Sequence, residues 1–226
     1  PPRSTLFPYT TLFRSEDPVE YRLSYVKQTQ VNEKAGYEFA SAARTFMRQD
    51  PDVMLLGEIR DEETAQMAVR AAITGHLVLS TLHTNDAATA IPRLLDLKVD
   101  KFLLSSALSA VLAQRLVRKN CKHCSEPYQL SQDEQEIFRH HGLELTEGVH
   151  GKGCSKCNGN GFTGRVAICE VLEIDHSIRQ LIFEGASTGN IMDVAMINGM
   201  KPLLHDGILK AAEGITTISE VLRVAG

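Results

Sequence analysis

Two pairs of cysteines stand at the spacing of metal ligands. The stretch "CKHC" contains Cys121 and Cys124, and "CSKC" contains Cys154 and Cys157, with 29 residues between the pairs. This arrangement fits a tetrahedral site of four thiolates, for which Zn²⁺ is the usual ion. Because four protein ligands leave no open position for water, we expect the Zn²⁺ to be structural. The alternative is four thiols without a metal.

Three polar clusters could act on a phosphate. "EDPVEY" begins at Glu16, "GEIRD" follows the apolar "VMLL", and "STLHTND" follows the apolar "HLVL". In open α/β sheets, ligands bind at the carboxyl ends of the strands. Acidic side chains there can hold Mg²⁺ through water and position a nucleophilic water, while a His and a Thr on a neighbouring strand can contact a γ-phosphate. Each cluster taken alone could instead be a helix cap with a surface acid.

The elements that must position these clusters alternate between strand and helix. Apolar runs predict buried strands at 52–58 and 76–82. The remaining pattern predicts helices at 36–49, 61–74, 86–97 and 101–119. This alternation favours an α/β fold with a parallel sheet.

The pattern changes after Cys121. We expect a short capped helix at 131–142 between the cysteine pairs and a strand at 164–174. Four short helices separated by glycine follow, at 175–185, 190–199, 201–214 and 216–225. The chain therefore reads as a sheet core, a metal-clipped insert and a helical tail.

Composition narrows the class of protein. The net charge of −4 over 226 residues argues against a general nucleic-acid binder, which is usually basic. No apolar run approaches the ~20 residues of a membrane span, and the start lacks the apolar segment of a signal peptide. We therefore expect a cytosolic protein, whose reduced cysteines bind metal rather than form disulfides. The fifth cysteine, Cys169, falls in an apolar run and is expected to be a small buried residue.

Residues 1–15, "PPRSTLFPYTTLFRS", have a different character from the rest. The triplet "TLF" occurs twice, with no helical period. We expect a foreign segment, such as a translated sequencing adaptor joined to a gene fragment, which should be set aside in fold reasoning. The alternative is a poorly ordered native terminus.

Several long motifs together resemble one family. "EDPVEY", "RQDPDVMLLGEIRDEETAQMAVRAAITGHLVLSTLHTNDA", "LAQRLVRKNCKHC", "GCSKCNGNGFTGR" and "DGILKAAEGITTISEVLRV" look like the ATPases of type II secretion and type IV pilus assembly. The resemblance runs from about Glu16 to the C-terminus. It implies a RecA-like core of the P-loop NTPase type with ATP and Mg²⁺ as ligands. In that family, "EDPVEY" is the aspartate box, "LLGE" the Walker B strand and "TGHLVLSTLHTN" the histidine box.

The resemblance also implies roles for single residues. Glu58 would coordinate Mg²⁺ through water, and Glu16, Asp17 and Glu20 would position the attacking water, with Glu20 as general base. His83 would sense the γ-phosphate, with Thr81 beside it. The arginines that could contact phosphate or a neighbouring subunit, or instead form salt bridges with nearby acids, are Arg44, Arg48 and Arg60.

One part of the family pattern is absent. A P-loop reads G-x-x-x-x-G-K-[ST], and the only Gly-Lys pair, Gly151-Lys152, is followed by Gly153. We therefore expect the C-terminal part of an ATPase, inactive as it stands. The domains expected are 1–15 as the foreign segment, 16–119 as the partial RecA-like core, 120–165 as the zinc insert and 166–226 as a strand and helical region.

The resemblance implies partners and leaves rival functions open. It implies a homo-hexamer on the cytoplasmic side of the inner membrane, docked to a membrane-anchored platform and other assembly proteins. A pilus retraction ATPase is one alternative, although such enzymes typically lack the cysteine pairs. Another is a zinc-dependent binding module, because "CSKCNGNG" also matches the repeated unit of the J-domain chaperones' zinc region.

Overall fold

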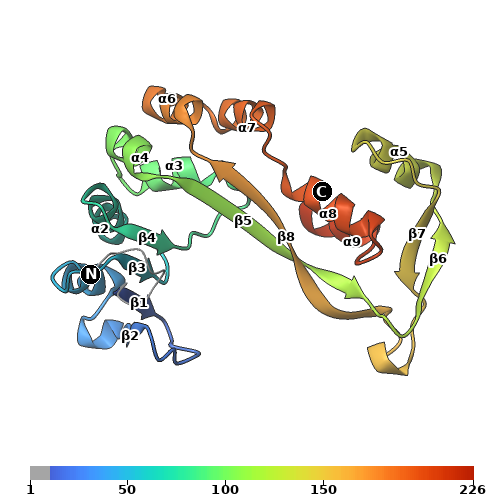
Figure 1. Ribbon diagram of the computed structural model, residues 1–226, viewed down its shortest axis with the longest axis horizontal. Coiled ribbons are helices and arrows are strands. Elements are labelled where there is room, and N and C mark those ends of the chain that lie inside the picture. The colour runs from blue at the N-terminus through green and yellow to red at the C-terminus, as the bar shows by residue number, and fades with distance from the viewer. Residues whose placement is uncertain (1–10) are drawn as a thin grey trace, which may run out of the picture. The chain divides into compact units, whose positions relative to one another are not determined.

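The computed structural model describes residues 11–226, which form two compact units (Figure 1). The first unit runs to Ser109 and adds Ile174–Met192, and the second contains Ala110–Glu173 and Asp193–Gly226. The first unit therefore takes its last helix from a part of the chain that follows most of the second. This division differs from the predicted boundaries at 119/120 and 165/166.

A parallel sheet forms the centre of the first unit. Its strand order is β2 (Lys27–Gln30), β1 (Leu12–Glu16), β3 (Val53–Leu56) and β4 (Leu77–Ser80), and every neighbouring pair is parallel. The predicted α/β fold with a parallel sheet is confirmed, as are the strands expected within 52–58 and 76–82. The prediction that the second of these strands is buried is wrong, because Leu77 and Leu79 on the edge strand β4 are 56% and 46% exposed. Strand β1 includes residues 12–15, which belong to the segment predicted to be foreign; its origin stays a prediction, and residues 1–10 lie outside the described residues.

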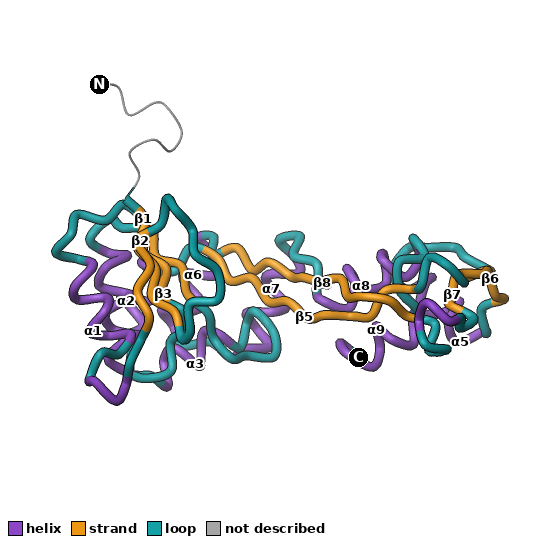
Figure 2. Tube along the Cα trace, turned by 90° about the horizontal axis from the view of Figure 1, so that it is seen from below, coloured by secondary structure: helices purple, strands orange, loops and turns teal. Residues whose placement is uncertain are grey.

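Helices α1 (Phe39–Phe46) and α2 (Glu62–Ile73) pack against this sheet (Figure 2). Helix α1 directs Phe39 and Phe46 inwards, and α2 directs alanines such as Ala65 and Ala68 inwards at helical spacing. Asp61 caps α2 by accepting a hydrogen bond from the Thr64 backbone N–H at 2.8 Å. The helices expected within 36–49 and 61–74 are confirmed.

Three further helices belong mainly to the first unit. They are α3 (Ala90–Asp96), α4 (Lys101–Ala107) and α6 (His176–Glu184). Helix α4 packs against both α2 and α6, and the rings of Phe102 and Phe183 meet edge to face with centroids 6.5 Å apart. Helix α7 (Thr188–Ile197) straddles the boundary between the units.

The second unit is built on two long antiparallel strands, β5 (Ala110–Asn120) and β8 (Phe162–Glu173). The predicted helix at 101–119 is therefore wrong beyond Ala107. Residues 110–120 are rich in Leu, Ala, Gln and Arg, which have high helix propensity, but their exposure alternates from one residue to the next. The segment is a strand because it pairs with β8, some fifty residues away in sequence.

The metal-clipped insert and the helical tail complete the second unit. The insert contains β6 (Ser125–Gln129), α5 (Gln132–His140) and β7 (Glu147–Gly151), and the tail ends with α8 (Leu203–Ala212) and α9 (Ile218–Ala225). A capping box between Ser131 and Glu134 starts α5, as expected. The strand predicted at 164–174 and the four predicted C-terminal helices are confirmed, whereas β1, β2, β6 and β7 are not predicted from the sequence.

Two details of the described residues bear on the sequence predictions. Within 11–226, no helix is both long and apolar enough to cross a bilayer. Cys169 is half-buried rather than buried, and its backbone N–H donates to Asp206 Oδ2 at 2.7 Å.

Candidate functional site

The three predicted polar clusters lie at one edge of the parallel sheet. The register pairs Ser15 with Leu56 and Leu56 with Ser80, so β1, β3 and β4 end at the same level. Glu16 is the last residue of β1, Glu58 lies two residues after β3, and Thr81 directly follows β4. The fold therefore gathers chain segments separated by more than twenty residues at the edge where α/β sheets bind ligands.

Glu58 is the centre of a small charged cluster. Its Oε1 accepts from Arg60 Nη2 at 2.6 Å, and its Oε2 lies 3.2 Å from His83 Nε2. The Glu58 side chain is 14% exposed, whereas that of His83 is 87% exposed. The hydrogen bond from Arg60 lowers the pKa of Glu58 most, with His83 adding to the effect, so this carboxylate is anionic near neutral pH.

Arg60 is held by acids on several segments. The hydrogen bond to Glu58 raises the pKa of Arg60 most, and the charges of Asp17 and Glu33 add to the shift. Glu33 Oε1 lies 3.8 Å from Arg60 Nη1. The salt-bridge alternative for the arginines thus describes Arg60 in this structure, and it also describes Arg44, which pairs with Glu63.

Gly57 and Thr81 fix the backbone that presents Glu58. The Thr81 hydroxyl donates to the Gly57 carbonyl at 2.7 Å, and the Ile59 N–H donates to the Thr81 carbonyl at 3.0 Å. A Cβ at position 57 would lie 2.8 Å from the Ser15 carbonyl oxygen and 2.9 Å from the Phe39 ring. Only glycine lets β1 and β3 approach this closely. Thr81 therefore supports the turn after β3 that carries Glu58.

The acids of "EDPVEY" separate into buried and exposed members. Glu16 is buried, and its carboxylate binds Arg14 Nη2 at 2.9 Å and Gln28 Nε2 at 2.6 Å. Asp17 and Glu20 are exposed on the loop after β1. Glu20 makes no hydrogen bond or ion pair with the other residues of 11–226. No motif in the sequence marks Gln28 or Arg14 as partners of the Glu16 carboxylate.

The four predicted metal ligands form one cluster in the second unit. Their sulfur atoms lie within 4.8 Å of one another. The distances are 3.9 Å for Cys121–Cys154, 3.8 Å for Cys124–Cys157 and 3.8 Å for Cys154–Cys157. Four sulfurs each ~2.3 Å from a tetrahedral Zn²⁺ would lie about 3.8 Å apart. These three separations therefore match those of a tetrahedral zinc site.

The surroundings of the sulfurs favour thiolates at some positions and oppose them at others. The Cys154 N–H donates to Cys157 Sγ at 3.1 Å and lowers the pKa of Cys157 to about 6, while the Thr163 hydroxyl lowers the pKa of Cys121. Burial raises the pKa of Cys124 to about 12. Four close thiolates repel one another unless a cation neutralises them, so metal binding would displace protons from this cluster.

Comparison with known proteins identifies the family. The family model described as "Type II/IV secretion system protein" matches residues 6–223. The chain belongs to this family. It is 50% identical over 212 residues to the type IV pilus assembly ATPase PilB of Thermus thermophilus, covering 92% of this chain and 24% of the relative. It is 46% identical over 209 residues to the type II secretion system protein HxcR of Pseudomonas aeruginosa, covering 92% of this chain and 41% of the relative.

Solved structures agree with the fold of this secretion-family chain. The crystal structure of the pilus retraction motor PilT with bound ADP superimposes with a TM-score of 0.67 and 28% identity, covering 95% of this chain and 52% of that one. The ATPase DotB of Legionella pneumophila has a TM-score of 0.63 at 20% identity, covering 95% of this chain and 51% of that one. The chain thus spans between about a quarter and a half of the proteins it resembles.

The cysteine cluster of this family member is tied to the C-terminal helices. Asn120, directly before Cys121, donates through its side-chain amide to the carbonyls of Val149, Gly214 and Thr216 at 2.9–3.1 Å. A buried apolar cluster joins the same parts, with Leu130 and Phe138 from the insert packed against α8 and α9. The insert and the tail therefore share one core, in contrast to an isolated clip.

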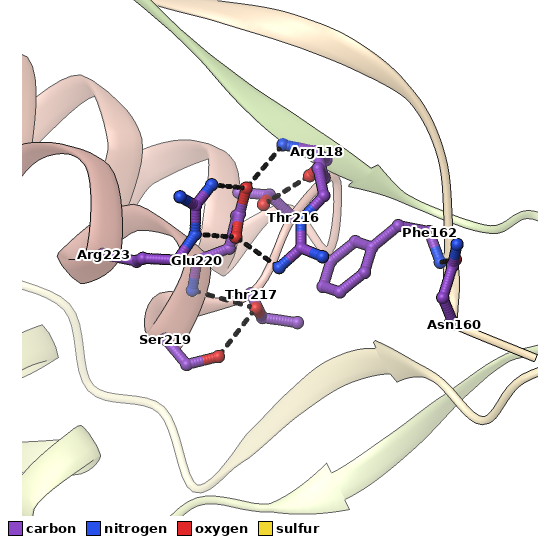
Figure 3. Close-up of polar contacts among 8 residues, drawn as sticks. All are labelled: Arg118, Asn160, Phe162, Thr216, Thr217, Ser219, Glu220 and Arg223. Carbon is purple, nitrogen blue, oxygen red and sulfur yellow. Dashed lines mark hydrogen bonds and ion pairs between the residues drawn. The ribbon is translucent and has the colours of Figure 1, made fainter.

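A buried carboxylate reinforces this joint (Figure 3). Glu220 on α9 lies between the guanidinium groups of Arg118 and Arg223, and its side chain is only 1% exposed. The Arg118 guanidinium stacks on the Phe162 ring, 4.2 Å from its centroid. Thr216 donates its hydroxyl to the Arg118 carbonyl at 2.7 Å. The end of β5, the start of β8 and the start of α9 are thus locked together next to the cysteines.

Proposed function

We propose that the chain forms the C-terminal part of a hexameric ATPase that powers assembly of a type IV pilus or a type II secretion pseudopilus from the cytoplasmic face of the inner membrane. The observation that supports it most is the convergence of Glu16, Glu58 and His83 at one sheet edge, in a chain of the type II/IV secretion family. Both relatives described above are named for these two systems.

The site residues fit the binding of ATP with Mg²⁺. Glu58 is a carboxylate with a lowered pKa at the end of a buried strand, which suits the water shell of a divalent cation. When bound, Mg²⁺ neutralises charge on the β- and γ-phosphates. His83 would release Glu58 and contact the γ-phosphate, because its exposed side chain is free to rotate and it touches the cluster through one nitrogen. Arg60 would then hold Glu58 in place.

The exposed acids are suited to proton transfer. Glu20 accepts no hydrogen bond from the described residues, so its carboxylate is available to a water. We assign Glu20 as general base, Asp17 as a second group orienting the water, and Glu16 as the buried anchor of the loop. The phosphate cradle itself would come from residues outside this chain.

Zn²⁺ would occupy the Cys121, Cys124, Cys154 and Cys157 cluster. The sulfur separations match a tetrahedral Cys₄ site, and no further coordination position remains for a substrate. The metal would therefore stabilise the insert and the surface it presents to a membrane-anchored platform or to another subunit.

Pilus retraction is the second candidate function. The likeness to the retraction motor PilT at 28% identity supports it. The identities of 46–50% to proteins named for pilus assembly and secretion favour the first candidate.

The experiment joins residues 16–226 to the upstream half of the Thermus relative, which restores a phosphate cradle, and measures ATP affinity beside turnover. Glu20→Gln should bind ATP normally and lose about 10²–10⁴ in turnover, as removal of a general base does. Glu58→Gln should weaken Mg²⁺-dependent binding and turnover together. Normal hydrolysis by Glu20→Gln with loss in Glu16→Gln would transfer the role of base to Glu16, and no turnover in the joined parent would overturn the proposal.

A further inference from the structure

Gln28 on β2 makes three side-chain hydrogen bonds to the segment that carries the acids. Its Nε2 donates to Glu16 Oε1 at 2.6 Å and to the Tyr21 carbonyl at 2.8 Å. Its Oε1 accepts from the Leu23 N–H at 2.7 Å. Both amide N–H groups and the carbonyl oxygen are therefore used, and a flipped amide would oppose oxygen to oxygen at two of these contacts.

The loop between Glu16 and β2 has few other anchors. Val19 N–H reaches Gln30 Oε1 only at 3.4 Å, and Val26 N–H donates to the Leu23 carbonyl within the loop itself at 3.2 Å. Its two tyrosines, Tyr21 and Tyr25, are 77% and 80% exposed, so they do not tie the loop down by burial. A hollow of about 570 Å³ lies beneath it. The residues lining this hollow include Val19, Arg22, Leu23, Gln28 and Gln30.

We propose that Gln28 is a positioning residue that fixes the loop carrying Asp17 and Glu20 to the buried carboxylate of Glu16. The effect of Gln28 on catalysis rests on the proposed function, whereas its effect on the structure of the loop does not. Glu16 is itself held by Arg14, so Gln28 connects a rigid sheet residue to a loop that lacks its own core. Exposed Glu20 would then be presented at a constant distance from Glu58.

The three hydrogen bonds at position 28 require an amide side chain, because two are donated and one is accepted. Alanine removes all three bonds. Glutamate keeps the shape and the acceptor for Leu23 but cannot donate, and it places a second carboxylate beside Glu16. Two carboxylates this close cannot both ionise easily, so one takes up a proton as the pH falls and the bond between them returns. Arg14, which binds Glu16 at 2.9 Å, moderates this repulsion. The other charged groups on the loop and on β2 are Arg22 and Lys27 among the cations and Asp17 and Glu20 among the acids.

The first test is trypsin cleavage after Arg22 in the 226-residue chain, followed by mass spectrometry. Gln28→Ala and Gln28→Glu should both increase the rate of this cut at about pH 8 by roughly tenfold, because the loop loses hydrogen bonds that hold it to the sheet and therefore opens more often. The matched control is Gln49→Glu, which makes the same charge change at an exposed position of the first unit and should leave the rate unchanged. Cleavage after Arg22 at the parent rate in both variants would overturn the inference.

The second test separates positioning from general loss of structure. The melting temperature of Gln28→Glu should lie below that of the parent at about pH 8 and approach it at about pH 4.5, because the shared proton restores the contact with Glu16. Gln28→Ala and Gln49→Glu should show no such recovery. A deficit in Gln28→Glu that is the same at both pH values would also contradict the proposed contact.

The third test asks whether the loop matters for turnover. In the joined ATPase, Gln28→Ala should lower kcat by about tenfold or more while KM for ATP stays within about twofold, since the loop would orient water and not bind nucleotide. If the joined parent shows no turnover while the trypsin result holds, the proposed function fails and the positioning of the loop stands; if Glu20→Gln and Glu58→Gln retain full turnover, the roles assigned to these two acids fail. An unchanged kcat in Gln28→Ala with Glu20→Gln inactive would show that Gln28 does not position the acids.

Discussion

Arg118 binds Glu220 through both its backbone and its side chain. The Arg118 N–H donates to Glu220 Oε1 at 3.1 Å, and its Nη2 donates to Oε2 at 2.7 Å. Arg223 donates to the same two oxygens from Nη2 and Nε, at 2.7 and 2.8 Å. These bonds, those from Arg223 first, lower the pKa of Glu220 to about 2. A residue 102 positions away in sequence thereby becomes a fixed neighbour of β5.

Glu220→Gln should destabilise the second unit by about 2 kcal/mol near neutral pH. The amide cannot accept four charge-assisted bonds, although solvent screening of the half-exposed arginines limits the loss. The folded pKa lies below the unfolded value, so the parent's stabilisation is present above about pH 4.5 and is lost as the pH falls towards 2. Urea midpoints of the parent should converge with those of Glu220→Gln over that range. The control Glu213→Gln, at an exposed position, should follow the parent.

Purified chain should carry about one Zn²⁺ per molecule. Cys121→Ser or Cys157→Ser should abolish this binding, while Cys169→Ser, which changes a thiol outside the cluster, should retain it. Because Asn120 and Phe138 join the insert to α8 and α9, amide exchange should increase in both the insert and the last two helices, with β3 and β4 protected as before. Faster exchange confined to residues 121–161 would contradict this coupling, and much less than one equivalent of Zn²⁺ in protein purified without chelators would contradict the metal site.

A pair of histidines should make the second unit sensitive to mild acid. His141 Nδ1 and His205 Nδ1 lie 3.0 Å apart, so only one proton fits between them. Burial, followed by the charges of His205 and His140, lowers the pKa of His141. The unfolded chain therefore binds the extra proton more readily, and stability should fall by about 1 kcal/mol as the pH falls below about 6.5. His205→Asn should flatten this dependence and His176→Asn, an exposed control, should not; equal slopes in all three proteins would refute it.

Gly57→Ala should disturb the edge where Glu58 is presented. The added methyl group meets the Ser15 carbonyl and the Phe39 ring at less than contact distance, so β1 and β3 must separate. We expect a loss of about 1–3 kcal/mol in unfolding free energy. Gly189→Ala serves as the control, because its nearest neighbour would be 3.9 Å away. If both variants have the melting temperature of the parent, the close approach of the backbone at Gly57 is not required for stability.

Local sequence signals predict most of the helices and strands, but not the strands that depend on pairing with a distant part of the chain. The Ser131 cap, the acids that open α2 and the apolar run at β3 each fix an element through neighbours in sequence. Strand β5 was mistaken for helix because its residue types favour helix, and only its distant partner β8 makes it a strand. Strand β2, "KQTQ", has no apolar residue to mark it.

The candidate sites were predictable to different degrees. The cysteine spacing alone predicted the ligands of the cluster, since a tetrahedral site constrains residue type and separation. The resemblance to a family supplied Glu58 and His83, and the structure brings their side chains together. Gln28 could not be found from sequence, because its importance lies in the three atoms it reaches and a surface glutamine carries no mark of them.

The pairing of β5 with β8 allows the insert, residues 121–161, to be replaced as one segment. The chain leaves β5 at Asn120 and re-enters β8 at Phe162, and these two residues are Cα partners. A short turn could therefore replace residues 121–161 without changing the register of the strands below it. Such a shortened chain would leave Ile208 and Val221 facing solvent where Phe138 and Leu130 now cover them. Grafting the insert between homologues thus requires exchanging the face of α8 and α9 that packs against it.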